Sequence, residues 1–210
     1  MTLAIDQLTF ERNDTLLFSE ISFALKSGEA LEIRGENGCG KSTLLRIIAG
    51  YIRPEIGSIT WQHKNIYHHP DEYAMQISWL GHANGIKSQL TVLENLKLSS
   101  ALSEIKIEDD ILKIILRKMK LENLTNTQAL YLSAGQKRRL ALSRLLLAPT
   151  RLWILDEPTT SLDHAGIEIF TDMLHQHLSQ GGMAVIATHQ DLKIQNMQTL
   201  HLQHEDAAHV

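Results

Sequence analysis

The stretch "GENGCGKST", residues 35–43, decides the fold of this chain. Gly35, Gly40, Lys41 and Ser42 fill every fixed position of the pattern G-x-x-x-x-G-K-[ST], which binds phosphate where it follows a strand and opens a helix. Its glycines let the backbone curl until N–H groups point at phosphate oxygens, and the helix start adds partial positive charge. Both flanks agree with that context, because an apolar strand precedes the stretch and an apolar helix follows it.

Every residue of the loop is therefore a candidate for holding a nucleotide. Lys41 is expected to reach the β- and γ-phosphates, and the Ser42 hydroxyl is expected to bind Mg²⁺. The predicted ATP-binding residues of the loop are Gly35, Glu36, Asn37, Gly38, Cys39, Gly40, Lys41, Ser42 and Thr43.

A second motif, which is acidic, follows a predicted strand. "LWILDEP", residues 152–158, places Asp156 at the end of an apolar strand, where a parallel sheet has its ligand crevice. Asp156 is expected to hold Mg²⁺ directly or through water, and Glu157 to orient and polarise an attacking water. Two consecutive carboxylates would also suit the start of a helix, where acids are favoured.

Around these motifs, apolar strands alternate with amphipathic helices. Strands that are apolar throughout need cover on both faces, so the pattern predicts an α/β fold with a mostly parallel sheet, flanking helices and a small antiparallel part. The expected strands are 3–10, 21–25, 30–34, 55–62, 76–80, 151–158 and 183–189, and the expected helices are 41–49, 140–147 and 165–178.

The stretch from residue 91 to about 130 has a different pattern. "TVLENLKLSSAL" and "IEDDILKIILRKMK" carry apolar residues three and four positions apart, as amphipathic helices do. We expect one domain over residues 1–210, with approximately residues 84–130 as an α-helical subdomain inside it. The last residues, 205–210, are expected to form a frayed tail.

Composition narrows the class of protein. With 210 residues, 43% of them hydrophobic, the chain can bury a core without disulfides, and the single Cys39 cannot form one within the chain. A net charge of -4 argues against nucleic acid as a partner. The N-terminus does not match a secretory signal, and the most apolar stretch, 140–155, is too short and too charged to span a bilayer. Membrane contact is expected only through partners.

The stretch "YLSAGQKRRLALSRLLL", residues 131–147, separates the classes of phosphate-loop protein. Ser133 and Gly135 open a helix there, so free N–H groups and a hydroxyl can face an anion, although a plain helix N-cap would look similar. With the motifs above, the stretch resembles the ABC ATPase family over essentially the whole chain. The signature LSGGQ is matched, with one Ala for Gly, by Leu132, Ser133, Ala134, Gly135 and Gln136.

That resemblance implies further roles. Asp163 in "SLD" matches the D-loop, which crosses a dimer interface, and His189 in "IATHQ" matches the switch histidine that contacts the γ-phosphate. It also implies catalysis by Glu157 with His189, ATP and Mg²⁺ as cofactors, and a second copy of the chain as partner. In such a head-to-tail dimer, each ATP lies between the phosphate loop of one copy and Ser133 of the other.

The adenine contact departs from the family pattern. The family usually has an aromatic residue before the phosphate loop, and this chain has Arg12 there, with Phe10 two residues earlier on the same predicted strand face. A guanidinium stacks on flat rings, so we expect Arg12 to contact adenine, with Phe10 as the other candidate. Cys39 inside the loop is expected to be a small, tolerated residue.

Two other groups of polar residues are not expected to form binding sites. The histidines 68, 69, 175 and 177 have metal-like spacing without supporting ligands, so we expect no zinc site. Lys137, Arg138 and Arg139 are expected to form a solvated helix face rather than a nucleic-acid patch.

"WLGHANGIKSQLT", residues 79–91, narrows the resemblance. ABC ATPases normally have a Gln here, in a loop that touches Mg²⁺ and moves with the membrane partner, and this chain has His82 instead. The glycine–histidine pair followed by "GIKSQLTVLENL", together with "LSAGQ" and Arg12, is similar to the CcmA family, the ATPase subunits of cytochrome c maturation (haem export) complexes.

The CcmA resemblance implies a peripheral protein on the cytoplasmic side of a bacterial inner membrane. Its partners would be the integral-membrane permease CcmB with CcmC and CcmD, and its ATP hydrolysis would drive release of a haem-loaded chaperone. The alternative is the ATPase subunit of an ABC transporter for another substrate, because substrate choice is made elsewhere. A ribosome or DNA factor and a switch that does not hydrolyse ATP are less favoured, since the chain has one cassette and intact Lys41, Asp156, Glu157 and His189.

Overall fold

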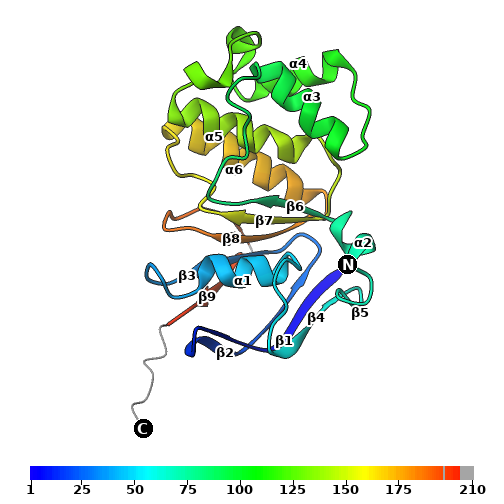
Figure 1. Ribbon diagram of the computed structural model, residues 1–210, viewed down its shortest axis with the longest axis vertical. Helices are drawn as coiled ribbons and strands as arrows, with labels where there is room; N and C mark the ends of the chain where they lie inside the picture. Colours follow the sequence, from blue (N-terminus) through cyan, green and yellow to red (C-terminus); the bar gives the residue numbers. More distant parts are fainter. Residues whose placement is uncertain (196, 204–210) are drawn as a thin grey trace.

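A five-stranded parallel sheet positions the phosphate loop, which connects the carboxyl end of β3 to α1 (Figure 1). Its strand order is β6-β7-β8-β3-β9, and each hydrogen-bonded pair runs parallel. The computed structural model describes residues 1–195 and 197–203, so the expected tail at 205–210 lies outside the described residues. The strands are β3 (Ala30–Arg34), β6 (Ile77–Leu80), β7 (Leu152–Asp156), β8 (Met183–Ala187) and β9 (Met197–His201).

A second, antiparallel sheet has the order β2-β1-β4-β5. Its first two strands form a hairpin in which Arg12 pairs with Thr15. The two connecting residues, Asn13 and Asp14, both have positive φ, as the tight turns of hairpins require. The strands are β1 (Thr2–Arg12), β2 (Thr15–Lys26), β4 (Ile56–Trp61) and β5 (Lys64–Asn65).

Helices cover both faces of the parallel sheet (Figure 1). α1 (Lys41–Ile48) lies between the two sheets, and the short α2 (Pro70–Ala74) leads into β6. The opposite face is covered by α5 (Ala134–Ser143) and α6 (His164–Ser179), and α3 (Val92–Leu102) and α4 (Asp109–Lys118) pack beyond α5, farther from the sheet. Three 3₁₀ turns, η1 (Glu122–Leu124), η2 (Ala129–Tyr131) and η3 (Arg144–Leu146), connect the latter helices. No helix among the described residues has the length and apolar character of a membrane span.

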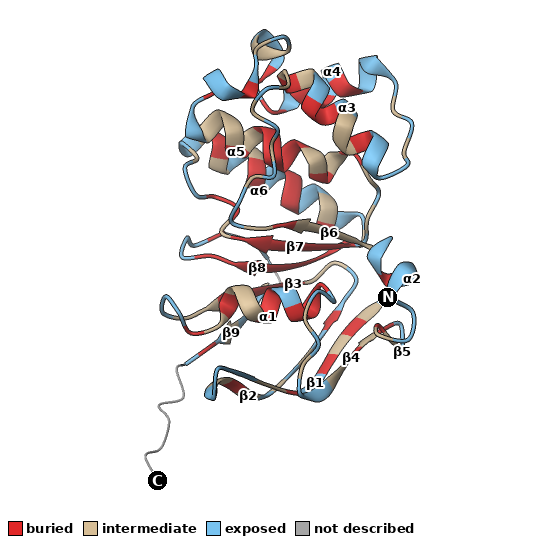
Figure 2. Cartoon of the chain, viewed as in Figure 1, coloured by how far each residue is buried: buried red, intermediate tan, exposed pale blue. Residues whose placement is uncertain are grey.

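The core is divided by the parallel sheet, as the buried residues in Figure 2 show. Successive side chains of a strand point to opposite faces. In β7, Trp153 and Leu155 therefore pack with the α3–α6 layer, whereas Leu152 and Ile154 pack with α1 and the antiparallel sheet. Burial on both faces explains why this strand is apolar throughout.

The predicted α/β fold is confirmed, with differences at specific places. The expected helix at 140–147 tightens into the 3₁₀ turn η3 after Ser143, ahead of Pro149. Three short or peripheral elements, β5, α2 and β9, are absent from the expectations drawn from the sequence. β9 is an edge strand with mostly exposed or half-buried side chains, so its sequence lacks an apolar strand pattern.

Candidate nucleotide-binding site

A pocket of about 510 Å³ lies where β7 and β8 end and α1 begins. Carboxyl ends of parallel strands are the usual ligand crevice of such sheets. The pocket brings together residues from the phosphate loop, both strand ends, β1 and the loop after β6. It is lined by Arg12, Leu17, Asn37, Gly38, Gly40, Lys41, Ser42, Thr43, His82, Asp156, Glu157, Thr160 and His189.

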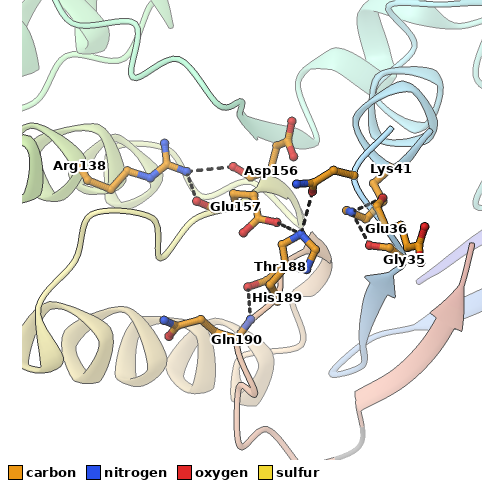
Figure 3. Close-up of polar contacts among 10 residues, drawn as sticks. Gly35, Glu36, Lys41, Arg138, Asp156, Glu157, Thr188, His189 and Gln190 are labelled. Carbon is orange, nitrogen blue, oxygen red and sulfur yellow. Dashed lines mark hydrogen bonds and ion pairs between the residues drawn. The ribbon is translucent and has the colours of Figure 1, made fainter. Parts of the chain in front are cut away.

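The phosphate loop is held closed by its own lysine (Figure 3). Lys41 is only 8% exposed, and its Nζ donates to the backbone oxygens of Gly35 (2.6 Å) and Glu36 (2.9 Å). A cation thus lies at the rim of the loop, beside the helix start. A Cβ at Gly35 would overlap the carbonyl oxygen of Leu202, so the first glycine of the motif is needed for close backbone packing.

The first amides of α1 have no hydrogen-bond acceptor among the described residues. Gly40 precedes the helix with φ of +99°, and no side chain in the described part of the chain caps it. The first intrahelical bond is donated by the Leu44 amide to Gly40 O (2.8 Å), so the amides of residues 41–43 have no partner within the helix. These amides and Lys41 make a site for an anion.

Not all loop residues face the pocket. Gly35, Glu36 and Cys39 are outside its lining, and the Cys39 side chain is 1% exposed and packs in the core. A Cβ built on Gly35 would also lie 2.6 Å from the Cys39 sulfur. The thiol is therefore a small packing group that holds the loop from behind.

Asp156 and Glu157 follow one another at the end of β7. Asp156 is 5% exposed, lines the pocket and makes no side-chain hydrogen bond among the described residues. Glu157 has φ of +49°, an uncommon conformation for a residue with a side chain, and its amide donates to Ala187 O (2.8 Å). Its buried Oε1 accepts no hydrogen bond in the described part of the chain. Within the described residues, the polar group beside this oxygen is the His189 ring.

His189 completes the polar wall of the pocket (Figure 3). Its Nε2 lies 3.4 Å from Glu157 Oε1, an ion-pair distance if the ring is protonated, and 3.3 Å from Asn37 Oδ1. His189 is the second residue after β8 (Met183–Ala187), and the buried Thr188 lies between them. The structure thus joins three segments far apart in sequence, as the motifs predict.

The structure separates the two candidates for the adenine contact. A register shift in the β1–β2 pairing lies between Phe10 and Glu11. Phe10 stacks on Phe18, with ring centroids 6.2 Å apart, whereas Arg12 lines the pocket. Leu17 and Thr160, which no sequence motif singles out, also line it.

Comparisons with known proteins agree with this geometry. The sequence profile of the ABC transporter family matches residues 18–160. The protein named cytochrome c biogenesis ATP-binding export protein CcmA from Vibrio cholerae is 41% identical over 194 residues, 92% of this chain and 94% of that protein. Its namesake from Methylococcus capsulatus is 42% identical, over 91% of this chain and 93% of that protein.

This chain belongs to the ABC transporter family of ATP-binding proteins. It is an ATPase, and it resembles the CcmA members of that family. The fold agrees: the solved structure of a Pyrococcus furiosus protein titled an ABC transporter ATP-binding protein has a TM-score of 0.85 at 23% identity, covering 96% of this chain and 98% of that one.

The ABC signature residues lie at the start of α5, outside the pocket lining. Ser133 caps the helix, accepting from the Gln136 amide (3.2 Å), while its own amide donates to Gln136 Oε1 (2.8 Å). Ser133 and Ala134 are exposed. The plain N-cap that the sequence allowed is therefore present, and of the five signature residues Ser133 and Ala134 are the exposed ones.

Close packing ties the signature helix to the D-loop. A Cβ at Gly135 would lie 2.7 Å from the carbonyl oxygen of Ser161, which itself has φ of +66°. Asp163 caps α6, accepting from the Gly166 amide (2.9 Å). Gly135 is therefore a packing requirement, and Asp163 has a structural role in the single chain.

The expectation for Arg138 is wrong. It is 3% exposed rather than solvated, and it contacts the residues around Asp156 and the loop that carries His82. Its helix turns this position inward, toward the strand end, whereas its neighbours Lys137 and Arg139 are half-buried. A run of three cations gives no sign of which one is buried, because helix rotation relative to the core decides it.

Proposed function

We propose that this chain is the ATP-hydrolysing subunit of an ABC complex for cytochrome c maturation. The observation that carries the proposal is the pocket that unites the phosphate loop, Asp156, Glu157 and His189. The biological assignment is supported by about two-fifths identity to CcmA proteins over nine-tenths of the chain. Residues 1–210 would form a single nucleotide-binding domain, with 84–130 as its α-helical subdomain.

ATP would lie in the pocket with its phosphates on α1. The amides of the phosphate loop and Lys41 Nζ would bind the phosphate oxygens, and Lys41 would exchange its two carbonyl partners for them. The guanidinium of Arg12, which also lines the pocket, would stack on adenine.

The residues present suit Mg²⁺. Asp156 has a buried carboxylate without a side-chain hydrogen bond among the described residues, and Ser42 offers a hydroxyl in the same pocket. Such oxygen ligands are those that Mg²⁺ prefers. Bound there, the ion would neutralise negative charge on the phosphates as the bond breaks.

Hydrolysis would use the Glu157 carboxylate. Its Oε1 would accept a proton from a water whose oxygen attacks the γ-phosphorus. The bond from that phosphorus to the bridging oxygen breaks, and ADP leaves with the electron pair. His189, 3.4 Å from the same carboxylate oxygen, would contact the γ-phosphate and keep Glu157 in place.

A second copy of the chain would complete each site. The signature residues 132–136 do not line the pocket, so their proposed contact with ATP requires another subunit. The exposed positions of Ser133 and Ala134 at the start of α5 suit a head-to-tail dimer, with the D-loop of Asp163 at the interface. ATP that bridges both copies stabilises the closed dimer, and hydrolysis removes that stabilisation.

The remaining partners follow from the CcmA resemblance. We propose that the chain binds CcmB, with CcmC and CcmD, on the cytoplasmic side of a bacterial inner membrane, and that turnover releases a haem-loaded chaperone. Its membrane contact would go through these proteins, and nucleic acid would not be a partner. His82, which lines the ATP pocket, would sense the membrane subunit.

A complementation assay tests the assignment. A bacterial strain that lacks its own CcmA would be given this chain, and c-type cytochromes with covalent haem would be measured. Wild type should restore them, and Glu157→Gln should not, at equal protein level. Failure of wild type to restore them, with co-purification of an unrelated permease, would assign the ATPase to another transporter.

A further inference from the structure

Arg138 is a buried cation with every donor in use. Its Nε donates to Pro158 O (3.0 Å), and its Nη2 donates to Asp156 O (2.9 Å) and Glu157 O (2.7 Å), as Figure 3 shows for the last two. Three consecutive carbonyl groups at the end of β7 are thus held by one side chain. Lysine could not replace it, because only guanidinium has a planar fork of N–H groups.

The other side of the same guanidinium holds the loop after β6. Arg138 Nη1 donates to Gly81 O (3.1 Å) and to Asn84 Oδ1 (3.0 Å). These two residues flank His82, so both sides of the histidine are held. The five bonds use all five N–H groups of the guanidinium.

A second arginine holds the far end of this loop. Arg144 Nη2 donates to Asn84 O (2.7 Å), and its Nη1 donates to Gly85 O (3.4 Å). Residues 81–85 form neither helix nor strand, so contacts of this kind determine where the loop lies. Of the two arginines, only Arg138 also contacts the end of β7.

The strand end needs support at this point. Glu157 is in the left-handed region, at φ of +49°, which costs free energy for a residue with a side chain and persists only when neighbours hold it. Its amide is bound by Ala187 O and its carbonyl by Arg138. Burial lowers the pKa of Arg138 to about 10, so the guanidinium stays charged at neutral pH.

We propose that Arg138 is a positioning residue that couples the loop carrying His82 to the backbone of Glu157, so that the position of this loop sets the turnover rate. The proposal rests on the proposed roles of Glu157 and His82. A displaced loop would pull the shared guanidinium and shift the Glu157 carboxylate relative to its water. Misplacement of a catalytic group by about 1 Å can lower a rate about 100-fold.

The test is a double-mutant cycle on the purified full chain. Arg138→Lys keeps the charge but loses the fork, and Asn84→Ala removes one loop contact without touching the pocket residues. We expect kcat to fall about 10- to 100-fold for Arg138→Lys and several-fold for Asn84→Ala, with the Kd for ATP within about threefold of wild type. Asn84→Ala should have no further effect in the Arg138→Lys background.

The control is Lys137→Gln, on the same helix, whose Nζ contact with Leu130 O is exposed. It should leave kcat unchanged. Additive effects, or an Arg138→Lys loss that appears only as a smaller folded fraction, would overturn the proposal. If Arg138→Lys does not fold, the kcat of Asn84→Ala alone is the test. A several-fold lower kcat would support the proposal, and a kcat equal to that of wild type would overturn it. Wild-type turnover that Glu157→Gln does not lower would instead refute the proposed function.

Discussion

Two helices begin beside residues of the proposed ATP site, and they begin in opposite ways. α1 follows Gly40 and has no side-chain cap, whereas α5 follows Ser133, which forms a full capping box with Gln136. The free amides of α1 belong to the pocket of the same chain. Those of α5 are partly satisfied by the chain itself, on an exposed surface.

For the proposed dimer, the difference predicts that α1 receives the phosphates first. A missing N-cap costs about 1 kcal/mol, and a bound anion would offset that cost at α1. The α5 start is stable without ligand. The Ser133 hydroxyl accepts from the Gln136 amide, and in the proposed dimer its own proton would donate to a phosphate bound by the other subunit.

The largest expected effect is on kcat, in a variant that binds ATP at α1 but does not hydrolyse it. Glu157→Gln removes the proton acceptor, so kcat should fall about 10²- to 10⁴-fold, while the Kd for ATP stays within a few-fold. Size-exclusion chromatography with ATP should then show dimers, because the bridging nucleotide is not hydrolysed. A Glu157→Gln variant that hydrolyses ATP would contradict the proposed role of Glu157. A variant that stays monomeric with ATP would contradict the proposal that ATP at α1 of one copy binds the start of α5 in another.

Removal of the cation at α1 comes next. Lys41→Ala should weaken ATP binding about 10- to 100-fold, because a hydrogen bond to a charged group contributes about 1.5–3 kcal/mol. Calorimetric titration with ATP measures the change, and Lys137→Ala supplies a matched control that should bind normally. Equal weakening in both variants would show that Lys41 acts only through general charge.

The start of α5 should respond differently from that of α1. Ser133→Ala should leave ATP binding to the single chain unchanged but weaken the ATP-dependent dimer of the Glu157→Gln background about tenfold. Loss of the cap should also lower the free energy of unfolding by about 1 kcal/mol. Ser133→Asp keeps a cap but adds a negative charge, so it should restore stability without restoring the dimer. A dimer of normal strength with Asp would refute the phosphate contact.

The smallest expected effect is a pH dependence of the free energy of unfolding, which comes from His177 in α6 rather than from the start of α1 or α5. His177 stacks on Trp153 and bonds to Met183 O, and burial lowers its folded-state pKa below 6.5. The unfolded chain then takes up the proton first, so this contribution to stability is present above about pH 6.5 and lost as pH falls below it. Melting curves at about pH 7.5 and 5.5 should show a smaller decline for His177→Gln than for wild type. An identical decline in both proteins would show that His177 does not contribute to this pH dependence. The stability of variants at α1 and α5 is best compared above pH 6.5.

Sequence reasoning worked where chemistry is written in short local patterns. The sequence singled out Lys41 by a glycine loop between strand and helix and Asp156 by an acid at the end of an apolar strand, and the structure places both in the lining of one pocket. Such reasoning failed for β9 and Leu17. An edge strand has no apolar alternation, and nothing marks a leucine on one hairpin as the neighbour of a loop it meets only in the folded chain.

By itself, the sequence determined the phosphate loop, the acidic strand end and the resemblance to ABC ATPases, because each depends on residues adjacent in the chain. Only the tertiary structure placed Arg12 rather than Phe10 in the pocket lining, set the start of α1 in the same pocket as Asp156, and buried Arg138 between two distant loops. Those outcomes depend on strand register, on helix rotation and on which carbonyl groups meet in space. Such relations arise from packing across the sheet, which no local pattern records.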